Sequence, residues 1–174
     1  SIKLSDDQKK SLKEMVFINN KFRVHVLQGT TGSGKTFVYF EALKSIIKKG
    51  FQGLILLPEI GLTGQFEQKF VEYFGFNPAV WHSGVSKKKK EIIWNGISNG
   101  KIQVIIGARS SLFLPFKNLG LIIVDEEHDS SYKQEESVIY NARDMAISRA
   151  SIENIPIHLI TSIPSLETYN NIKI

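Results

Sequence analysis

The sequence predicts an α/β fold in which a mostly parallel sheet carries helices on both faces. Short runs rich in β-branched apolar residues alternate with helix-length segments, and this alternation is typical of strand–helix–strand units. The expected strands cover residues 23–28, 53–57, 79–82, 102–106, 119–124 and 157–161. The expected helices cover residues 36–49, 62–74, 86–98 and 141–153. A single domain over residues 1–174 accommodates these elements.

Two segments need a separate explanation. Ser5 and Gln8 have the Ser-x-x-Gln spacing of a capping box, and apolar residues follow at helical spacing. An opening helix is therefore expected to begin there. Residues 129–139 lack a clear period, which predicts a loop, and a long loop in a compact domain is a candidate for function.

The composition excludes several classes of protein. Hydrophobic residues make up 42% and charged residues 22%, so disordered, collagen-like and coiled-coil chains are excluded. The net charge of +5 suits a polyanionic partner without identifying one. The absence of Cys excludes thiolate metal sites, and the four His residues are far apart in sequence, so no zinc is expected. The apolar runs are too short for a membrane span and residues 1–15 too polar for a signal peptide, which predicts a soluble, non-secreted protein.

A phosphate-binding loop follows the first expected strand. The pattern G-x-x-x-x-G-K-[ST] is matched in full by Gly29-Thr30-Thr31-Gly32-Ser33-Gly34-Lys35-Thr36. Glycines allow backbone N–H groups to turn toward phosphates, and the helix that follows adds its positive end. Lys35 is then expected to reach the β- and γ-phosphates, and the Thr36 hydroxyl to bind Mg²⁺.

Acidic residues follow the buried strand at 119–124. Asp125 and Glu126 stand at its carboxyl end, the edge at which open α/β sheets bind ligands. Asp125 is expected to be the partner of Mg²⁺, and Glu126 to polarise a water molecule against the γ-phosphate. A solvated acidic loop is the structural alternative. His128 would be ordinary loop surface by itself, and only its place in Asp-Glu-x-His suggests a role.

Several segments together resemble the first RecA-like lobe of the PriA family of primosomal DNA helicases, within superfamily 2. They are the phosphate loop, Leu57-Pro58-Glu59-Ile60-Gly61-Leu62-Thr63, His82-Ser83-Gly84, residues 106–113, residues 125–134, residues 140–144 and Pro164-Ser165-Leu166-Glu167. The resemblance implies a RecA-like P-loop NTPase lobe that uses ATP and Mg²⁺ to move along single-stranded DNA and unwind forks during replication restart. A RecG-like translocase and a non-motor ATP switch are the alternatives.

The family resemblance also implies partners and a location. These are single-stranded and forked DNA, a second RecA-like lobe and other domains of a complete protein, and primosome or single-strand-binding proteins. The expected location is the bacterial cytoplasm, without a membrane. The chain starts at Ser1 without an initiator Met and is interpreted as a piece of a larger protein. Because arginine fingers in this family belong to the second lobe, the isolated chain is expected to be a nearly inactive monomer that binds nucleotide weakly.

Further roles follow from the resemblance residue by residue. Gln8 resembles the glutamine that reads the adenine edge, with a plain capping residue as the alternative. Two groups of residues resemble the family's contacts to single-stranded DNA. The first group is Gly61, Leu62 and Thr63, and the second is Arg109 and Ser110. For Arg109 a surface salt bridge is the alternative. Residues 87–90, a run of Lys, are interpreted as solvated surface or as an auxiliary DNA contact.

Residues 129–140 resemble the aromatic-rich loop through which such helicases couple DNA contact to hydrolysis. Together with His128, the coupling residues would be Tyr132, Lys133 and Tyr140, although the Tyr side chains could equally pack on the neighbouring helix.

The third helicase motif departs from the family pattern. This chain has Thr161-Ser162-Ile163 in place of Ser-Ala-Thr, so the usual hydroxyl is missing at Ile163 and would come from Thr161 or Ser162. Arg143 is the alternative candidate for an arginine finger within this chain, but it is expected to form a local ion pair with Asp144 instead.

Overall fold

The computed structural model of the protein describes residues 5, 6, 8–10, 21–28, 34–126 and 132–161, with residues 132–140 described by their backbone. Residues 6 and 8–10 are helical. The strands are β1 (Arg23–Gln28), β2 (Gln52–Leu56), β3 (Ala79–Trp81), β4 (Val104–Gly107), β5 (Leu119–Asp125) and β6 (Pro156–Thr161). The α-helices are α2 (Lys35–Lys48), α3 (Gly64–Phe74), α4 (Lys87–Ser98) and α5 (Tyr132–Glu153), and the 3₁₀ turns are η1 (Glu59–Gly61) and η2 (Arg109–Phe113).

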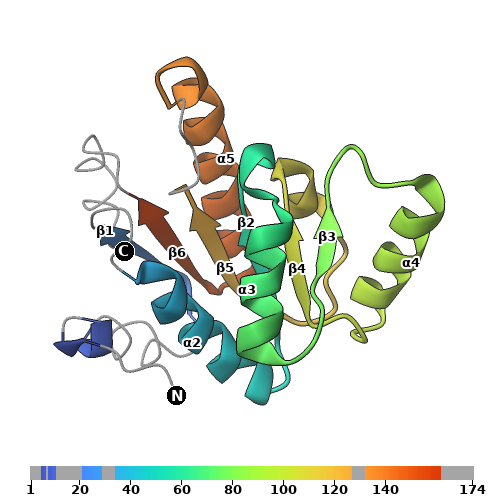
Figure 1. The fold of residues 1–174 in the computed structure, drawn as a ribbon, viewed down its shortest axis with the longest axis horizontal. Coiled ribbons are helices and arrows are strands. Elements are labelled where there is room, and N and C mark those ends of the chain that lie inside the picture. Colours follow the sequence, from blue (N-terminus) through green and yellow to red (C-terminus); the bar gives the residue numbers. More distant parts are fainter. Residues whose placement is uncertain (1–4, 7, 11–20, 29–33, 127–131, 162–174) are drawn as a thin grey trace.

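The described strands form one six-stranded sheet in the order β1-β6-β5-β2-β4-β3 (Figure 1). Every neighbouring pair is parallel. All six expected strands are present, with bounds shifted by a few residues, so the predicted fold class is confirmed. Because the strands are parallel, their carboxyl ends meet at one edge of the sheet, and β5 lies near the middle of that edge.

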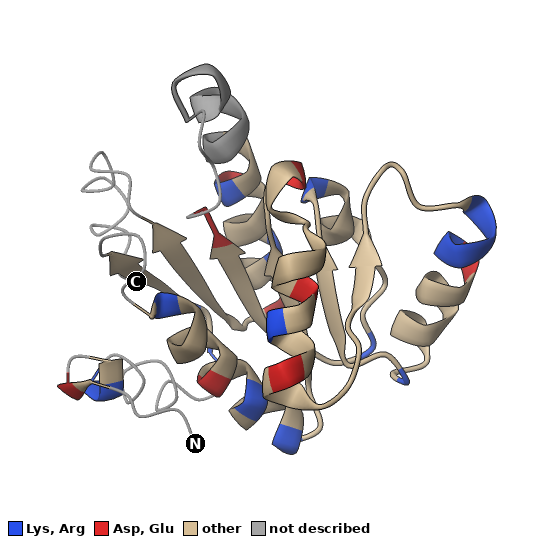
Figure 2. Ribbon diagram, in the orientation of Figure 1, with Lys and Arg blue, Asp and Glu red and all other residues tan. Residues whose placement is uncertain are grey.

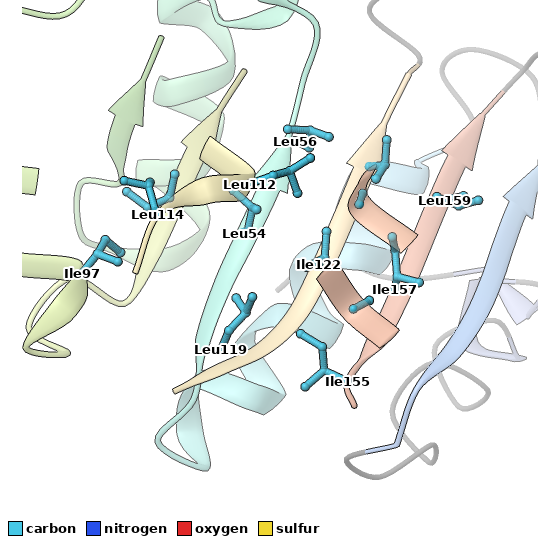
Figure 3. Packing of buried hydrophobic residues seen from close by; sticks show 14 of the residues in the cluster. Leu54, Leu56, Ile97, Leu112, Leu114, Leu119, Ile122, Ile155, Ile157 and Leu159 are labelled. Carbon is cyan, nitrogen blue, oxygen red and sulfur yellow. The ribbon is translucent and has the colours of Figure 1, made fainter. Parts of the chain in front are cut away.

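The two faces of the sheet bury separate cores. Helices α2 and α3 cover one face with a cluster that includes Phe40 and Phe70. Helices α4 and α5 cover the other face, where Ile122 and Leu159 belong to the second cluster (Figure 3). Residues of β5 alternate between them: Leu121 and Ile123 belong to the α2 face, Ile122 and Val124 to the α5 face. This alternation decides where the residues that follow Val124 point.

Helix α5 begins earlier than the sequence predicts. Residues 129–139 were expected to form a loop, but residues 132–139 are helical and continue into the expected helix. Figure 1 shows the first turns of α5 extending past the carboxyl edge of the sheet. A helical stretch without a sheet beneath it needs no apolar face, so its sequence has no helical period. Its Lys, Gln and Glu residues are nevertheless good helix formers.

The lysine run at 87–90 forms the first turn of α4, where Figure 2 shows a concentration of basic residues. Ser86 caps this helix, its Oγ accepting a hydrogen bond of 3.2 Å from the Lys89 backbone N–H. Lys87, Lys88 and Lys89 are exposed, and Lys90 Nζ lies 5.6 Å from the centroid of the Trp81 ring. This exposure agrees with a solvated surface, and a DNA contact there stays a prediction.

Two histidines that are far apart in sequence lie side by side. His25 on β1 and His158 on β6 are direct partners in the strand register, and their ring centroids are 5.3 Å apart. They form no metal site with a third ligand, since the described residues contain no group of three His, Cys, Asp or Glu suited to a metal ion. Burial, reinforced by the charge of His25, lowers the pKa of His158 from 6.5 to about 3.

We expect this chain to lose stability as the pH falls below 6.5. Unfolded His158 binds a proton near pH 6.5 whereas folded His158 does so near pH 3, so the unfolded state gains protons first. At pH 5 the loss is on the order of 2 kcal/mol. Urea unfolding of the chain at pH 5 and 7.5 measures it. His158→Leu should flatten the pH dependence, and equal slopes in the variant and the wild-type protein would contradict the assignment.

Candidate functional site

The start of α2 is shaped by a glycine and a glutamine. Gly34, the N-cap, has a φ of 78°, a left-handed conformation that favours glycine. A Cβ on Gly34 would also overlap the side-chain amide nitrogen of Gln8. Gln8 Oε1 accepts a hydrogen bond of 2.8 Å from the Ser5 N–H, and Ser5 Oγ accepts one of 3.3 Å from the Gln8 N–H. The predicted capping box is therefore present, and it places the Gln8 amide against the end of the phosphate loop.

Lys35 and Thr36 form the first turn of α2, and both are buried. Lys35 Nζ donates to the Thr161 carbonyl oxygen at the end of β6, with the two atoms 3.4 Å apart. The first turn of α2 contains no acidic residue, so no side chain of that turn offsets the positive end of the helix dipole. The predicted Gly29, Thr30, Thr31, Gly32 and Ser33 lie outside the described residues. What is described of this motif fits an anion site at the carboxyl edge of the sheet.

Asp125, the last residue of β5, points toward α2. Its side chain is fully buried, and the Tyr39 hydroxyl donates to its Oδ2 over 2.6 Å. Tyr39 follows Lys35 by one helical turn, so one face of α2 presents both residues to this edge. Sequence analysis missed Tyr39, because a Tyr among apolar helix positions is typical of a core residue. Its hydroxyl fixes the orientation of the Asp125 carboxylate.

Glu126 points the other way, toward α5. Arg143 Nε donates to Glu126 Oε1 and Arg143 Nη2 donates to Oε2, in a bidentate ion pair. The expected pair between Arg143 and Asp144 is thus wrong. Adjacent residues of a helix do not face each other, and here Asp144 is exposed while Arg143 is fully buried against the sheet.

The surroundings of Glu126 act on its proton affinity in opposite directions. Burial raises the pKa of Glu126, whereas the guanidinium of Arg143 and a hydrogen bond with the Thr161 side chain oppose the rise. Thr161 is one of the two residues expected to supply the hydroxyl missing at Ile163, and it does contact Glu126. Ser162 and Ile163 lie outside the described residues. The effect of Arg143 is therefore to favour the ionised carboxylate in a site that otherwise disfavours it.

A cavity of about 720 Å³ opens beside the acidic residues. Its lining includes Asp125, Glu126, Glu59, Arg109 and Ser110. It therefore joins the end of β5 to η1 and η2, the two turns that carry the predicted DNA contacts. A ligand bound against η2 would lie in the same cavity as the acidic residues.

The predicted DNA residues divide into two groups. Arg109 and Ser110 are exposed, and within the described ranges Arg109 has no carboxylate at ion-pair distance, which disfavours the salt-bridge alternative. Gly61 is buried, and Leu62 packs against the aromatic core. Thr63 is the N-cap of α3, with its side chain accepting from the Phe66 N–H over 3.2 Å. Leu62 and Thr63 thus have structural roles whether or not they contact DNA.

The predicted coupling residues are placed only in part. Tyr132, Lys133 and Tyr140 lie on α5 rather than on a loop, and only their backbone is described. His128 lies outside the described residues. The correction in this region concerns secondary structure: a helix, not an irregular loop, carries the aromatic residues toward the edge of the sheet.

The described residues suit Mg²⁺ held together with a phosphate ligand. Mg²⁺ usually retains water and takes one or two protein oxygens plus phosphate oxygens, so it needs no cluster of three protein ligands. The Thr36 hydroxyl and the Asp125 carboxylate are of this type, and Tyr39 orients the second. No described helix is long and apolar enough to cross a membrane.

The helix after a phosphate-loop motif starts with a lysine at the carboxyl edge of a parallel sheet, and the neighbouring strand β5 ends there in acidic residues. These features together define the class of P-loop nucleoside triphosphatases. Within that class, residues 5–164 match the model of the family described as DEAD/DEAH box helicase. The chain belongs to the DEAD/DEAH box helicase family.

Curated relatives show a more specific similarity within this family. The chain is 48% identical over 171 residues to replication restart protein PriA of Rickettsia conorii, a match that covers 98% of the chain and 26% of the relative. It is 41% identical over 168 residues to PriA of Bacillus subtilis, covering 95% of the chain and 21% of the relative. The resemblance to the first helicase lobe of PriA is confirmed, and the chain spans about a quarter of the length of these relatives.

Solved structures agree on the fold. RecG bound to a three-way DNA junction has a TM-score of 0.72 and 28% identity, covering 98% of the chain and 23% of the RecG chain. The DEAD-box helicase Mss116, bound to single-stranded RNA and UDP-BeF, has a TM-score of 0.65 and 15% identity. The match covers 96% of this chain and 37% of the Mss116 chain. The RecA-like lobe is confirmed as the fold. The higher identity to PriA than to RecG favours the first of the two motor alternatives.

Proposed function

We propose that this chain is the ATP-binding lobe of a PriA-type DNA helicase, which couples Mg·ATP hydrolysis to movement along single-stranded DNA and to fork unwinding in replication restart. One observation carries the proposal: a single cavity joins the acidic end of β5 to η2 with its exposed Arg109. A motor needs its hydrolysis site and its DNA site to be in contact, and a plain ATP switch does not.

Each residue at this edge has one chemical task. Lys35 and the first N–H groups of α2 bind the phosphates. Gln8, whose amide lies against Gly34, contacts the base of the nucleotide in this proposal. Thr36 and Asp125 would hold Mg²⁺, which when bound neutralises phosphate charge. Glu126 accepts a proton from the attacking water. The charge of the transferring phosphoryl group needs further cations, which by family resemblance come from the second RecA-like lobe.

DNA binds across η2 and the start of α3 without base recognition. Exposed hydroxyl and guanidinium groups contact backbone phosphates, and such contacts position a strand without reading its sequence. The turn before α3 contributes Gly61, Leu62 and Thr63 to this surface, and η2 contributes Arg109 and Ser110. The bacterial cytoplasm, forked DNA and primosome or single-strand-binding proteins belong to the same proposal, supported by the PriA relatives.

Steady-state ATPase assays of the full-length protein test the proposal. Single-stranded or forked DNA should stimulate hydrolysis severalfold or more, and forked DNA should be unwound. Hydrolysis that is indifferent to DNA, together with tight ATP binding, would favour the switch instead.

Arg109→Ala should weaken single-strand binding of the full-length protein for all base compositions alike. The loss of one phosphate contact lowers the slope of log affinity against log salt by roughly 0.7. Fluorescence anisotropy with oligo-dT and a mixed-sequence strand at several salt concentrations measures both effects. Lys117→Ala removes an exposed cation that precedes β5, at the opposite edge of the sheet, and should change neither. A loss restricted to one base composition would show that Arg109 reads bases.

A further inference from the structure

The two acidic residues at the end of β5 are held from opposite layers of the molecule. Successive residues of a strand point to opposite faces. Asp125 therefore meets Tyr39 of α2, and Glu126 meets Arg143 of α5. The roles proposed for the two carboxylates differ, and so do their partners: a neutral hydroxyl for one and a cation for the other.

Arg143 is an unusual residue to find where it lies. It is fully buried, and the other buried residues within 141–153, the part of α5 whose side chains are described, are Ala146 and Ala150. Removing a guanidinium from water costs several kcal/mol, and the pairing with a carboxylate does little more than offset this. An apolar side chain would fill the space at least as well. Packing therefore does not account for Arg143, whereas the bidentate bond to Glu126 does.

Arg143 also leaves Glu126 able to act on a water molecule. An ionised carboxylate has about four lone-pair positions, of which a bidentate arginine occupies two. Thr161 takes part in a further hydrogen bond, and Glu126 still lines the 720 Å³ cavity. The Glu126 backbone N–H is itself bonded to the Ile160 carbonyl oxygen over 3.0 Å, which fixes the position of the residue.

We propose that Arg143 is a positioning residue for ATP hydrolysis: its bidentate ion pair holds the Glu126 carboxylate from the α5 face in one orientation beside the γ-phosphate site. This inference rests on the proposed function and assigns a role to a residue within this lobe. Arg143 acts through Glu126 and does not contact the nucleotide. The predicted alternative, in which Arg143 reaches toward the γ-phosphate as a finger, conflicts with its complete burial and its pairing.

The test uses Arg143→Gln in the full-length protein, with ATP hydrolysis measured over a range of ATP concentrations in the presence of single-stranded DNA. Glutamine keeps hydrogen-bonding groups but removes the charge. We expect kcat to fall roughly 10- to 100-fold. This loss is smaller than the loss expected on removal of the general base itself, because Glu126 is still present. KM for ATP should stay within about threefold, since uniform binding of ATP is not affected.

Rescue by a conservative substitution separates positioning from a merely structural role. Arg143→Lys keeps the charge with fewer donors, so it should recover part of kcat. It also carries the test if the glutamine variant fails to fold.

Arg23→Gln is the control. Arg23 is an exposed arginine at the first residue of β1, at the amino edge of the sheet and away from Glu126. Its replacement should leave kcat unchanged. In a Glu126→Gln background, Arg143→Gln should cause no further loss of kcat. An unchanged kcat in Arg143→Gln, or additive losses of kcat in the double variant, would overturn the role of Arg143 alone. Absence of hydrolysis in the wild-type protein would overturn the proposed function together with it.

Discussion

Lys35→Ala is expected to lower ATP turnover of the full-length protein by roughly 10²- to 10³-fold, the range for loss of one preorganised charge contact to a transition state. Lys35 is the buried cation of the first turn of α2, and its Nζ lies at the ends of the strands that form the site. The fold should survive, because the variant loses the hydrogen bond to the Thr161 carbonyl oxygen but also removes the cost of burying a charge. Steady-state ATPase assays measure the turnover, and circular dichroism spectra show whether the variant is folded.

Lys48→Ala provides the control for this variant. Lys48 is an exposed lysine in the last turn of the same helix, so its removal changes the net charge equally and leaves the site intact. Wild-type hydrolysis in Lys35→Ala with an unchanged spectrum would show that the phosphate loop is assigned wrongly.

Glu126→Gln should remove most turnover, about 10²- to 10⁴-fold, while Mg·ATP still binds, because an amide is a poor proton acceptor. Asp125→Asn should instead weaken the metal-dependent part of ATP affinity. Titration of each variant with a fluorescent ATP analogue, once in Mg²⁺ and once in EDTA, distinguishes a loss of metal-dependent binding from a loss of turnover alone. An equal loss of binding in both variants would contradict the division of roles between the two carboxylates.

The two substitutions should also differ in their effect on stability. In Asp125→Asn the amide oxygen would still accept the hydrogen bond from the Tyr39 hydroxyl, so the cost should be small. Glu126→Gln would leave the buried Arg143 without its counter-charge, and breaking a buried ion pair costs about 3–5 kcal/mol. The activity of Glu126→Gln is therefore best measured at low temperature, next to an unfolding curve of the same protein.

The sequence predicted the strand–helix alternation, and the structure has all six strands because each apolar run is long and β-branched enough to be recognised locally. It predicted the capping box of Ser5 and Gln8 and the start of α2 for the same reason: the bonds involved span only a few residues. The first turns of α5 were missed because local periodicity reports packing, and those turns have no sheet to pack on.

The motifs by themselves determined the kind of chemistry at this site, since a phosphate loop and an acidic strand end need only local order to be recognised. Only the tertiary structure decided how the acidic residues are held. Tyr39 lies 86 positions from Asp125 and Arg143 lies 17 from Glu126. Those pairs depend on the strand order β1-β6-β5-β2, on the face to which each residue of β5 points, and on the helix that covers that face. These are long-range choices, determined by burial of the whole sheet rather than by neighbouring residues.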